Sequence, residues 1–307
     1  MSEHTERVKV ALAGEYRIER EIGRGATATV YLVHDLKHDR ALALKVLRSA
    51  VSASLGTERF LREIRILAQL QHPHILPLYD SGEAGGALFY IMPCIEGQSL
   101  RERLNRTGRI PLEDALNITR EVADGLHYAH AHDVVHRDIK PENILLADDH
   151  ALITDFGIAR PIHATGGARL TDPGTSVGTP TYMSPEQACG DRELDGRSDI
   201  YSLGCVLFEM LAGSPPFHGG TTQALVAQHM TIEAPMIHGP ELDVPPGIEN
   251  AIHTALEKDP DRRFATAEEF AAALVLPERG KIERLLRAIT PRSLRARGRR
   301  EPPADNS

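Results

Sequence analysis

The stretch His136-Arg137-Asp138-Ile139-Lys140-Pro141-Glu142-Asn143, followed by Asp155-Phe156-Gly157, is the most informative part of this sequence. It supplies an aspartate and an asparagine at the spacing Asp-x-x-x-x-Asn, and then a second aspartate. A phosphoryl-transfer site needs these groups, because one carboxylate orients the attacking hydroxyl while the amide and the other carboxylate hold magnesium against the phosphates. Asp-Phe-Gly alone recurs by chance, but the two motifs in this order and spacing predict such a site.

The sequence before these motifs predicts a small antiparallel sheet with one helix. Short β-rich runs punctuated by glycine are typical of consecutive antiparallel strands. The expected strands are at 16–19, 29–33, 41–47, 76–80 and 87–92. From 57 to 70 the apolar residues recur at helical spacing instead, which predicts an amphipathic helix that ends at His72-Pro73.

After Pro93 the sequence becomes rich in helical patterns. The expected helices are at 112–132, 199–211, 222–229, 247–257 and 266–274. Strands followed by helices predict an α+β body of two lobes, with a cleft between them as the natural ligand site. We expect an N-lobe at 16–92, a hinge at 93–97 and a C-lobe at 98–274, between an N-terminal extension (1–15) and a basic tail (275–307).

Composition limits the class of protein. The chain has 307 residues, 41% of them apolar, which is enough for a sizeable core. Its formal charge of −8 is uneven: residues 278–307 carry nine basic and four acidic side chains, so the remainder carries −13. Sequence-independent nucleic-acid binding needs a basic face. We therefore expect no nucleic-acid partner.

Cysteine usage and hydropathy predict a soluble, cytoplasmic chain. Cys94, Cys189 and Cys205 have neither an even count nor the paired spacing of a zinc site, which suits a reducing compartment. The apolar run 8–13 is too short for a signal peptide, and no run of about 18 apolar residues could span a membrane.

A glycine-containing loop and a lysine are further candidates for binding phosphate. The loop 22–30 lies between two expected strands, and Gly23 and Gly25 would let its backbone approach phosphate oxygens. A dinucleotide-binding fingerprint is excluded, because that motif leads into a helix and this loop leads into a strand. Lys45, on the next strand, could reach the same oxygens, with Glu63 as its counter-ion. Read alone, both side chains could equally be solvated.

With all these motifs in order, the chain resembles the eukaryotic-type protein kinases, and in particular the serine/threonine branch found in bacteria. The resemblance runs from about 16 to 274. It implies the two-lobed protein kinase fold, with an antiparallel-sheet N-lobe and a helical C-lobe. It also implies ATP as the phosphate donor, Mg²⁺ (or alternatively Mn²⁺) as the metal cofactor, and protein substrates with Ser or Thr acceptors.

The resemblance implies a role for each matching residue. Asp138 matches the catalytic aspartate, and Lys140 the lysine that contacts the transferred phosphate. Lys45 and Glu63 match the ion pair that positions the α/β-phosphates. The residues that match the metal ligands are Asn143 and Asp155.

The residues that match the nucleotide site are Ile22, Gly23, Arg24, Gly25, Ala28, Val30, Ala43, Lys45, Met92, Pro93, Ile95 and Leu145. Ala28 departs from the family pattern, which has a third glycine there. Met92 falls at the gatekeeper position. Pro93 has no N–H, but the family uses only the carbonyl at this position, and the N–H of Ile95 would donate to adenine.

Four structural contacts are also implied by the resemblance. Glu186 should form a buried bridge with Arg263, and Asp199 should anchor the backbone of the catalytic loop. A hydrophobic stack between the lobes should contain Leu67, Leu78, His136 and Phe156. Thr179 matches the threonine that hydrogen-bonds the catalytic aspartate in serine/threonine kinases.

The segment between Asp155 and Glu186 resembles a regulatory activation segment. In the family, an arginine at the position of Arg137 receives a phosphate from this segment. We expect autophosphorylation in trans at Thr171 and Thr175, which requires a transient homodimer. Ser176 is the weaker candidate.

Two other features are explained most simply without a functional site. His127, His130, His132 and His136 lie close together, but no Cys or further carboxylate completes a metal site. The tail from 278 reads as a solvated segment with a short helix docked on the C-lobe. Its alternative is contact with an anionic membrane surface or an acidic partner.

Two other functions compete with an active protein kinase. A pseudokinase scaffold would be expected to have lost some of the matching residues, and this chain retains them. A small-molecule kinase would share Asp-x-x-x-x-Asn but lack Ser184-Pro185-Glu186 and Thr179, which form a platform for a polypeptide. The sequence therefore favours a protein substrate.

Overall fold

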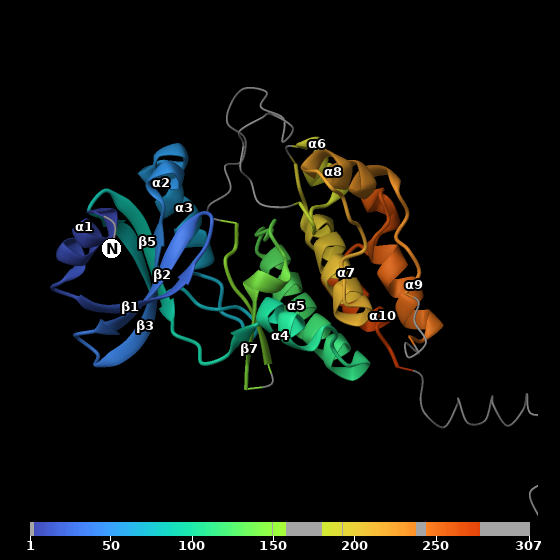
Figure 1. Ribbon diagram of the computed structural model, residues 1–307, viewed down its shortest axis with the longest axis horizontal. Coiled ribbons are helices and arrows are strands. Elements are labelled where there is room, and N and C mark those ends of the chain that lie inside the picture. Colours follow the sequence, from blue (N-terminus) through green and yellow to red (C-terminus); the bar gives the residue numbers. More distant parts are fainter. Residues whose placement is uncertain (1–2, 149, 158–179, 192, 238–243, 277–307) are drawn as a thin grey trace, which may run out of the picture.

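The computed structural model describes residues 3–148, 150–157, 180–191, 193–237 and 244–276. In Figure 1 these residues form two lobes, with the strands of the N-terminal half on one side and most helices on the other. The predicted α+β, two-lobed architecture is confirmed.

The N-lobe is built on a five-stranded antiparallel sheet. Its strands are β1 (Tyr16–Arg24), β2 (Ala28–Asp35), β3 (Arg40–Leu47), β4 (Asp80–Ala84) and β5 (Ala87–Pro93), in the order β1-β2-β3-β5-β4. Lys45 lies directly opposite Val30 on β2 and Tyr90 on β5. Because directly opposed residues point to the same side of a sheet, these three side chains share one face.

That face is covered by two helices, α2 (Ser49–Leu55) and α3 (Thr57–Leu67). Phe60 and Ile64 of α3 are buried in one apolar cluster with Leu47 and Leu88 of the sheet. The periodicity of the sequence predicted α3 but not α2. At seven residues, α2 is too short to show a clear helical repeat.

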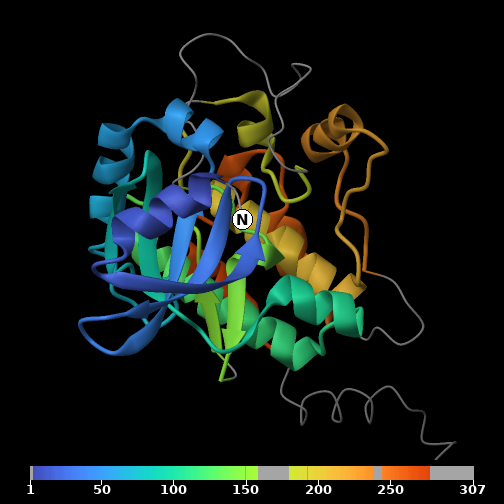
Figure 2. The same ribbon diagram turned by 60° about the vertical axis from the view of Figure 1, so that its left-hand side comes forward.

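The opposite face of the sheet is covered by α1 (Glu3–Leu12). Val8 and Leu12 are buried in a second apolar cluster with Val33, Leu44 and other strand residues. Figure 2 shows this helix (dark blue, beside the N label) over the strands. Much of the segment expected to be an N-terminal extension is therefore packed on the N-lobe.

One predicted strand is wrong. Residues 76–79 are not part of the sheet, and β4 begins only at Asp80. Leu76 donates its N–H to the carbonyl of Ile153 in the C-lobe, and Tyr79 donates to Ile91. Pro77 between them has no N–H to donate, so the segment cannot continue a regular ladder.

The C-lobe contains the helices that the sequence predicted, with boundaries shifted by a few residues. These are α5 (Leu112–Ala131), α7 (Gly196–Ala212), α8 (Thr222–Thr231), α9 (Pro246–Ala255) and α10 (Ala267–Ala273). The structure adds the short helices α4 (Leu100–Thr107) and α6 (Pro185–Cys189). Residues 198–211 of α7 are all buried, so this helix is the centre of the lobe.

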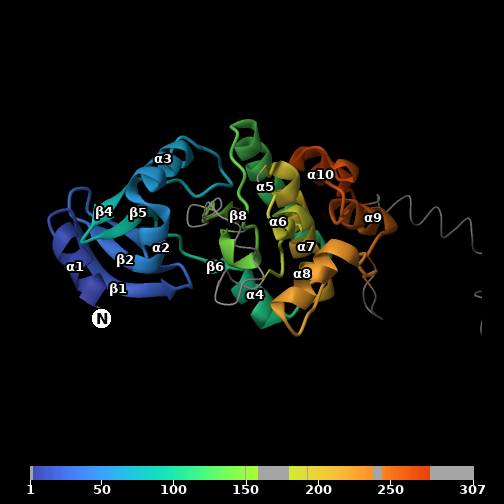
Figure 3. The same cartoon turned by 90° about the horizontal axis from the view of Figure 1, so that it is seen from above.

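A small sheet lies where the two lobes meet (Figure 3). It consists of β6 (Gln98–Ser99), β7 (Ile144–Ala147) and β8 (His150–Ile153). The loop with Asp138 and Asn143 leads into β7, and Asp155 follows β8. Pairing β7 with β8 therefore brings the two motifs, which are separate in sequence, to one end of the same hairpin.

Candidate active site

Asp138, Lys140 and Asn143 lie together on the loop before β7. The Nζ atom of Lys140 is 2.6 Å from Oδ2 of Asp138. The Nδ2 atom of Asn143 donates to the backbone carbonyl of Asp138 at 2.8 Å and to its carboxylate at 3.1 Å. Because the amide nitrogen faces Asp138, the amide oxygen is the atom left to bind a cation.

The backbone of this loop is anchored by Asp199 of α7, as the resemblance implied. Its carboxylate accepts the backbone N–H groups of Arg137 at 2.7 Å and His136 at 2.8 Å. It also binds Nε2 of His130 at 2.8 Å. Burial raises the pKa of Asp199, but these bonds and the nearby histidines outweigh it and hold the pKa below its ordinary value.

This anchoring holds an unusual backbone conformation. Arg137 has φ 67°, in the left-handed region that non-glycine residues rarely adopt. Such conformations persist where the surroundings over-determine them, and they occur often at active sites.

His136 links the loop to the Asp-Phe-Gly motif. Its Nδ1 accepts the N–H of Asp138 at 3.2 Å, and its Nε2 lies 2.9 Å from the carbonyl of Thr154. Burial lowers the pKa of His136, which favours the neutral ring with the proton on Nε2. The ring centre is 4.6 Å from that of Phe156, so the predicted His136–Phe156 contact of the stack is present.

The expected ion pair between Lys45 and Glu63 is not the one that the structure contains. Lys45 pairs with Asp155. Glu63 instead accepts a hydrogen bond from Nε of Arg59 at 2.9 Å. Arg59 lies one turn earlier on α3, at the i,i+4 spacing that brings two helix side chains together. The prediction missed this competing partner.

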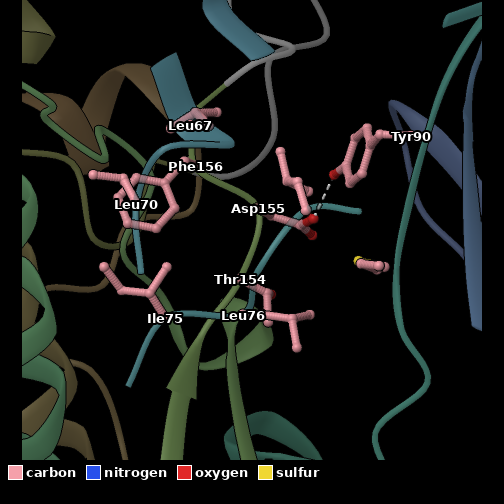
Figure 4. A pocket seen from close by; sticks show the side chains of 10 residues that line it. Leu67, Leu70, Ile75, Leu76, Tyr90, Thr154, Asp155 and Phe156 are labelled. Atoms are coloured by element: carbon pink, nitrogen blue, oxygen red, sulfur yellow. Dashed lines mark hydrogen bonds between the residues drawn. The ribbon is translucent and has the colours of Figure 1, made fainter. Parts of the chain in front are cut away.

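Asp155 is also held by Tyr90 of β5, whose hydroxyl donates to Oδ1 at 2.8 Å (Figure 4). Burial by itself raises the pKa of Asp155. The charge of Lys45 and the hydrogen bonds from Lys45 and Tyr90 lower it by more, so the pKa is below its ordinary value. The carboxylate is therefore ionised at neutral pH, as a metal ligand must be.

An apolar pocket lies beside Asp155 (Figure 4). It is lined by three residues of the expected stack, Leu67, Leu78 and Phe156, together with the gatekeeper candidate Met92. Leu67 comes from α3, so a movement of that helix would change the pocket.

The glycine loop connects β1 to β2. Ile22, Gly23 and Arg24 end β1, and Gly25 donates its N–H to the carbonyl of Ala28 at 2.9 Å. Ala28 is buried in the cluster beneath the sheet. The methyl group that replaces the third glycine of the pattern therefore packs into the core.

The adenine-site candidates come from both lobes. Val30 and Ala43 lie on β2 and β3, and Ala43 is directly opposite Met92 in the sheet. Pro93 ends β5, and Ile95 follows it in the partly exposed connection between the lobes. Leu145 lies on β7 of the C-lobe.

The predicted bridge between Glu186 and Arg263 is confirmed. Both guanidinium nitrogens Nη1 and Nη2 donate to the carboxylate at 2.8 Å, and the Arg263 side chain is fully buried. Burial raises the pKa of Glu186, but Arg263 and Ser198 lower it by more, so the pKa lies below its ordinary value. The bridge fixes α6, which ends the activation segment.

Sequence reasoning missed a hydrogen-bonded network that joins α4 to the loop before β7, to Tyr182 and to α7. Arg101 of α4 binds Glu142 of the loop before β7 and Glu209 of α7, with N–O distances of 2.8 Å each. Tyr182 donates to Glu209 at 2.5 Å. Tyr90 was missed as well. Its position two residues before Met92 on a predicted strand was the available signal, because alternate residues share a face.

Several predicted residues lie outside the described part of the chain. These are Thr171, Thr175, Ser176, Thr179 and the tail from 277. Among the described helices, none is both long and apolar enough to cross a membrane.

Known proteins resemble this chain along most of its length. The sequence profile of the protein kinase domain matches residues 16–274. Serine/threonine-protein kinase PknB of Mycolicibacterium smegmatis is 37% identical over 302 residues, covering 96% of this chain and 48% of that protein. PrkC of Bacillus subtilis is 38% identical over 265 residues (85% and 40%), and PknD of Mycobacterium tuberculosis is 40% identical over 263 residues (85% and 39%). The chain spans less than half the length of these relatives.

Proposed function

Because this chain belongs to the protein kinase domain family, we propose that it transfers the γ-phosphoryl group of ATP to Ser and Thr hydroxyls of proteins. The observation that carries the proposal is the convergence of Lys140 and Asn143 on Asp138, on a loop anchored by Asp199. The three similar proteins named above are all called serine/threonine-protein kinases, which supports Ser and Thr as acceptors.

In this mechanism Asp138 orients the substrate hydroxyl and accepts its proton. Lys140, 2.6 Å from Asp138, is placed to contact the transferred phosphoryl group. Lys45 neutralises the α/β-phosphates after it exchanges Asp155 for Glu63. Such a site works by positioning and by stabilising charge, since the protein forms no covalent bond.

The family uses a divalent metal ion, and we propose Mg²⁺, with Mn²⁺ as the alternative. The amide oxygen of Asn143 and the ionised carboxylate of Asp155 are hard oxygen ligands, which suit these ions. When bound, the ion neutralises charge on the phosphates and orients them.

We also propose the nucleotide contacts, the domain limits and the regulation. The backbone at Pro93 and Ile95 would bind the adenine edge, between Val30, Ala43 and Leu145. Residues 16–274 would form the catalytic domain, which is supported by the span of the family match. Thr171 and Thr175 would be phosphorylated in trans within a transient homodimer. The basic tail would be a solvated segment, with contact to an anionic surface as the alternative.

The first test is the intact mass of the protein after incubation with ATP and Mg²⁺. Added phosphates are expected on the wild type, and none with Asp138→Asn or without metal. Peptide mapping would then locate the modified residues. A generic protein substrate should be included, because a kinase that does not modify itself can still phosphorylate another protein. Phosphate transfer that persists in Asp138→Asn would contradict the assignment.

A further inference from the structure

We infer that Tyr90 is a positioning residue whose hydroxyl holds Asp155 on Lys45 in a resting arrangement, which competes with the pairing of Lys45 with Glu63. This inference rests on the proposed function, because it concerns access to the nucleotide-competent state of the same site. It assigns a role to a residue outside the motifs.

The fold places Tyr90 where it can act on Asp155. Tyr90 faces α3 between Leu88 and Met92, is buried, and lies directly across the sheet from Lys45. The ammonium of Lys45 lies 5.8 Å from the centre of the Tyr90 ring. The ring and the lysine therefore reach the same carboxylate from neighbouring strands, and Figure 4 shows the Tyr90 hydroxyl on Asp155.

Both donors act on the same atom. Lys45 and Tyr90 each contact Oδ1 of Asp155. A hydrogen bond to an ionised acceptor is stronger than one between neutral groups, and a buried hydroxyl that loses its acceptor is costly. The Tyr90 hydroxyl therefore stabilises the arrangement in which Asp155 engages Lys45.

The other half of the resting arrangement is on α3. Glu63 is held by Arg59 through Nε alone, while Nη2 of Arg59 is buried without a hydrogen-bond partner among the described residues. A bidentate pair would be stronger. This bond is suited to exchange, because Glu63 loses only one hydrogen bond when it moves to Lys45.

The two halves are coupled through Lys45. When the ammonium of Lys45 moves to Glu63, it gives up its contact with Asp155. The Asp155 carboxylate is then free to bind the metal ion. A side chain that stabilises only the resting state lowers the apparent affinity for a ligand of the other state. Removing the Tyr90 hydroxyl should therefore strengthen nucleotide binding.

The test is direct binding of ADP with Mg²⁺ to the full chain, measured by calorimetry. Tyr90→Phe keeps the buried ring and removes the hydroxyl, and we expect binding to become about five- to tenfold tighter. Tyr31→Phe is the matched control, since Tyr31 is buried in the same sheet but faces α1. Unchanged or weaker binding by Tyr90→Phe would overturn the inference.

A second measurement separates positioning from a general effect on folding. In a Glu63→Gln background Lys45 has no carboxylate to exchange to, so Tyr90→Phe should tighten binding by less than about twofold. An undiminished gain in that background would contradict the coupling.

A variant on the other half keeps the inference testable if Tyr90→Phe does not fold. Arg59→Gln removes the resting partner of Glu63 and should also tighten binding, whereas Arg65→Gln, on the exposed side of the same helix, should not. Equal affinities for these two variants would count against the exchange.

Failure of the inference is distinguishable from failure of the proposed function. A wild type that neither binds ADP with Mg²⁺ nor transfers phosphate overturns the proposed function. A wild type that does both, with Tyr90→Phe unchanged, overturns only the role of Tyr90.

Discussion

Asp199 accepts a hydrogen bond from the backbone N–H of Arg137 at 2.7 Å, although 62 residues separate them in the sequence. The acceptor is on the central helix of the C-lobe, and the donor is beside the catalytic aspartate candidate Asp138. Since Arg137 also has φ 67°, the loop depends on this carboxylate to keep its conformation. The position of Asp138 is therefore set by the core of the C-lobe.

Replacing Asp199 should damage both stability and activity. Asp199→Asn keeps one oxygen, so it cannot accept all three hydrogen bonds, and at least one buried donor loses its partner. We expect a loss of about 1–3 kcal/mol in the free energy of unfolding, measured with urea, and a lower kcat. Asp191→Asn, at an exposed position, is the control. Full activity in Asp199→Asn would refute the anchoring role.

Replacing Asp138 should separate catalysis from nucleotide binding. Asp138→Asn keeps the size of the side chain but removes the base, so turnover should fall about 10²–10⁴-fold while the affinity for ATP stays nearly the same. Steady-state kinetics and calorimetry measure the two quantities. Asp148→Asn, at the exposed turn after β7, should behave as the wild type. Unchanged turnover in Asp138→Asn would remove Asp138 from the mechanism.

Breaking the bridge at the end of the activation segment should destabilise the C-lobe. Arg263→Met leaves the Glu186 carboxylate in place without its bidentate partner. We expect a cost of about 3–5 kcal/mol in the free energy of unfolding, from urea denaturation. Arg262→Met removes a neighbouring arginine that is 68% exposed and should cost far less. Similar losses for the two variants would contradict the energetic importance of the bridge.

A buried histidine should make the protein sensitive to mild acid. His229 of α8 is 1% exposed and lies 3.0 Å from the Tyr201 hydroxyl, with Lys258 nearby. Burial, followed by the charge of Lys258, lowers the pKa of His229 to about 4. The unfolded chain therefore binds the proton more readily than the folded one. The free energy of unfolding therefore keeps its full value, as far as His229 is concerned, above pH about 6.5, and it decreases as the pH falls toward 4.

The midpoint of urea unfolding from pH 7 to 4 measures this effect. The wild type should lose up to about 3 kcal/mol through this group. His229→Leu cannot titrate, so it should be less stable at pH 7 but show a flatter pH profile. His218→Gln, at an exposed position, should keep the wild-type profile. A steep profile in His229→Leu would assign the acid sensitivity to other groups.

The N-terminal helix should contribute to the stability of the N-lobe. Val8 is 1% exposed beneath α1, whereas Val10 on the same helix is 71% exposed. Val8→Asp places a charge against the apolar face of the sheet and should cost at least about 2 kcal/mol in the free energy of unfolding. Val10→Asp should be nearly neutral. Equal effects on the melting temperature would show that α1 does not dock on the sheet in solution.

The parts of the fold that the sequence predicted are those encoded by local pattern. β-rich runs between glycines gave the strands near Lys45, and helical spacing gave α3, α5 and α7. The short α2, the N-terminal α1 and the irregular segment 76–79 were missed. Their structure depends on the surfaces that they contact, and a local repeat of a few residues does not encode those contacts.

The candidate site shows the same division. Asp138, Asn143 and Asp155 are identifiable from spacing alone, since the chemistry of phosphoryl transfer requires those groups in that order. Asp199 and the Glu186–Arg263 bridge were also predicted, through resemblance. The partners of Lys45 and Glu63 were not, because Asp155 binds Lys45 and Arg59 binds Glu63 in three dimensions.

The sequence by itself therefore determined the kind of protein, its two-lobed architecture and the candidate residues for its chemistry. Only the tertiary structure decided which charged groups pair, that α1 covers the outer face of the sheet, and that Tyr90 binds Asp155. The physical reason is that motif spacing and periodicity follow from the chain, whereas ion pairing depends on distances between side chains on different elements. Lys45 on β3 therefore meets Asp155, which follows β8 in the other lobe, while Glu63 on α3 meets Arg59.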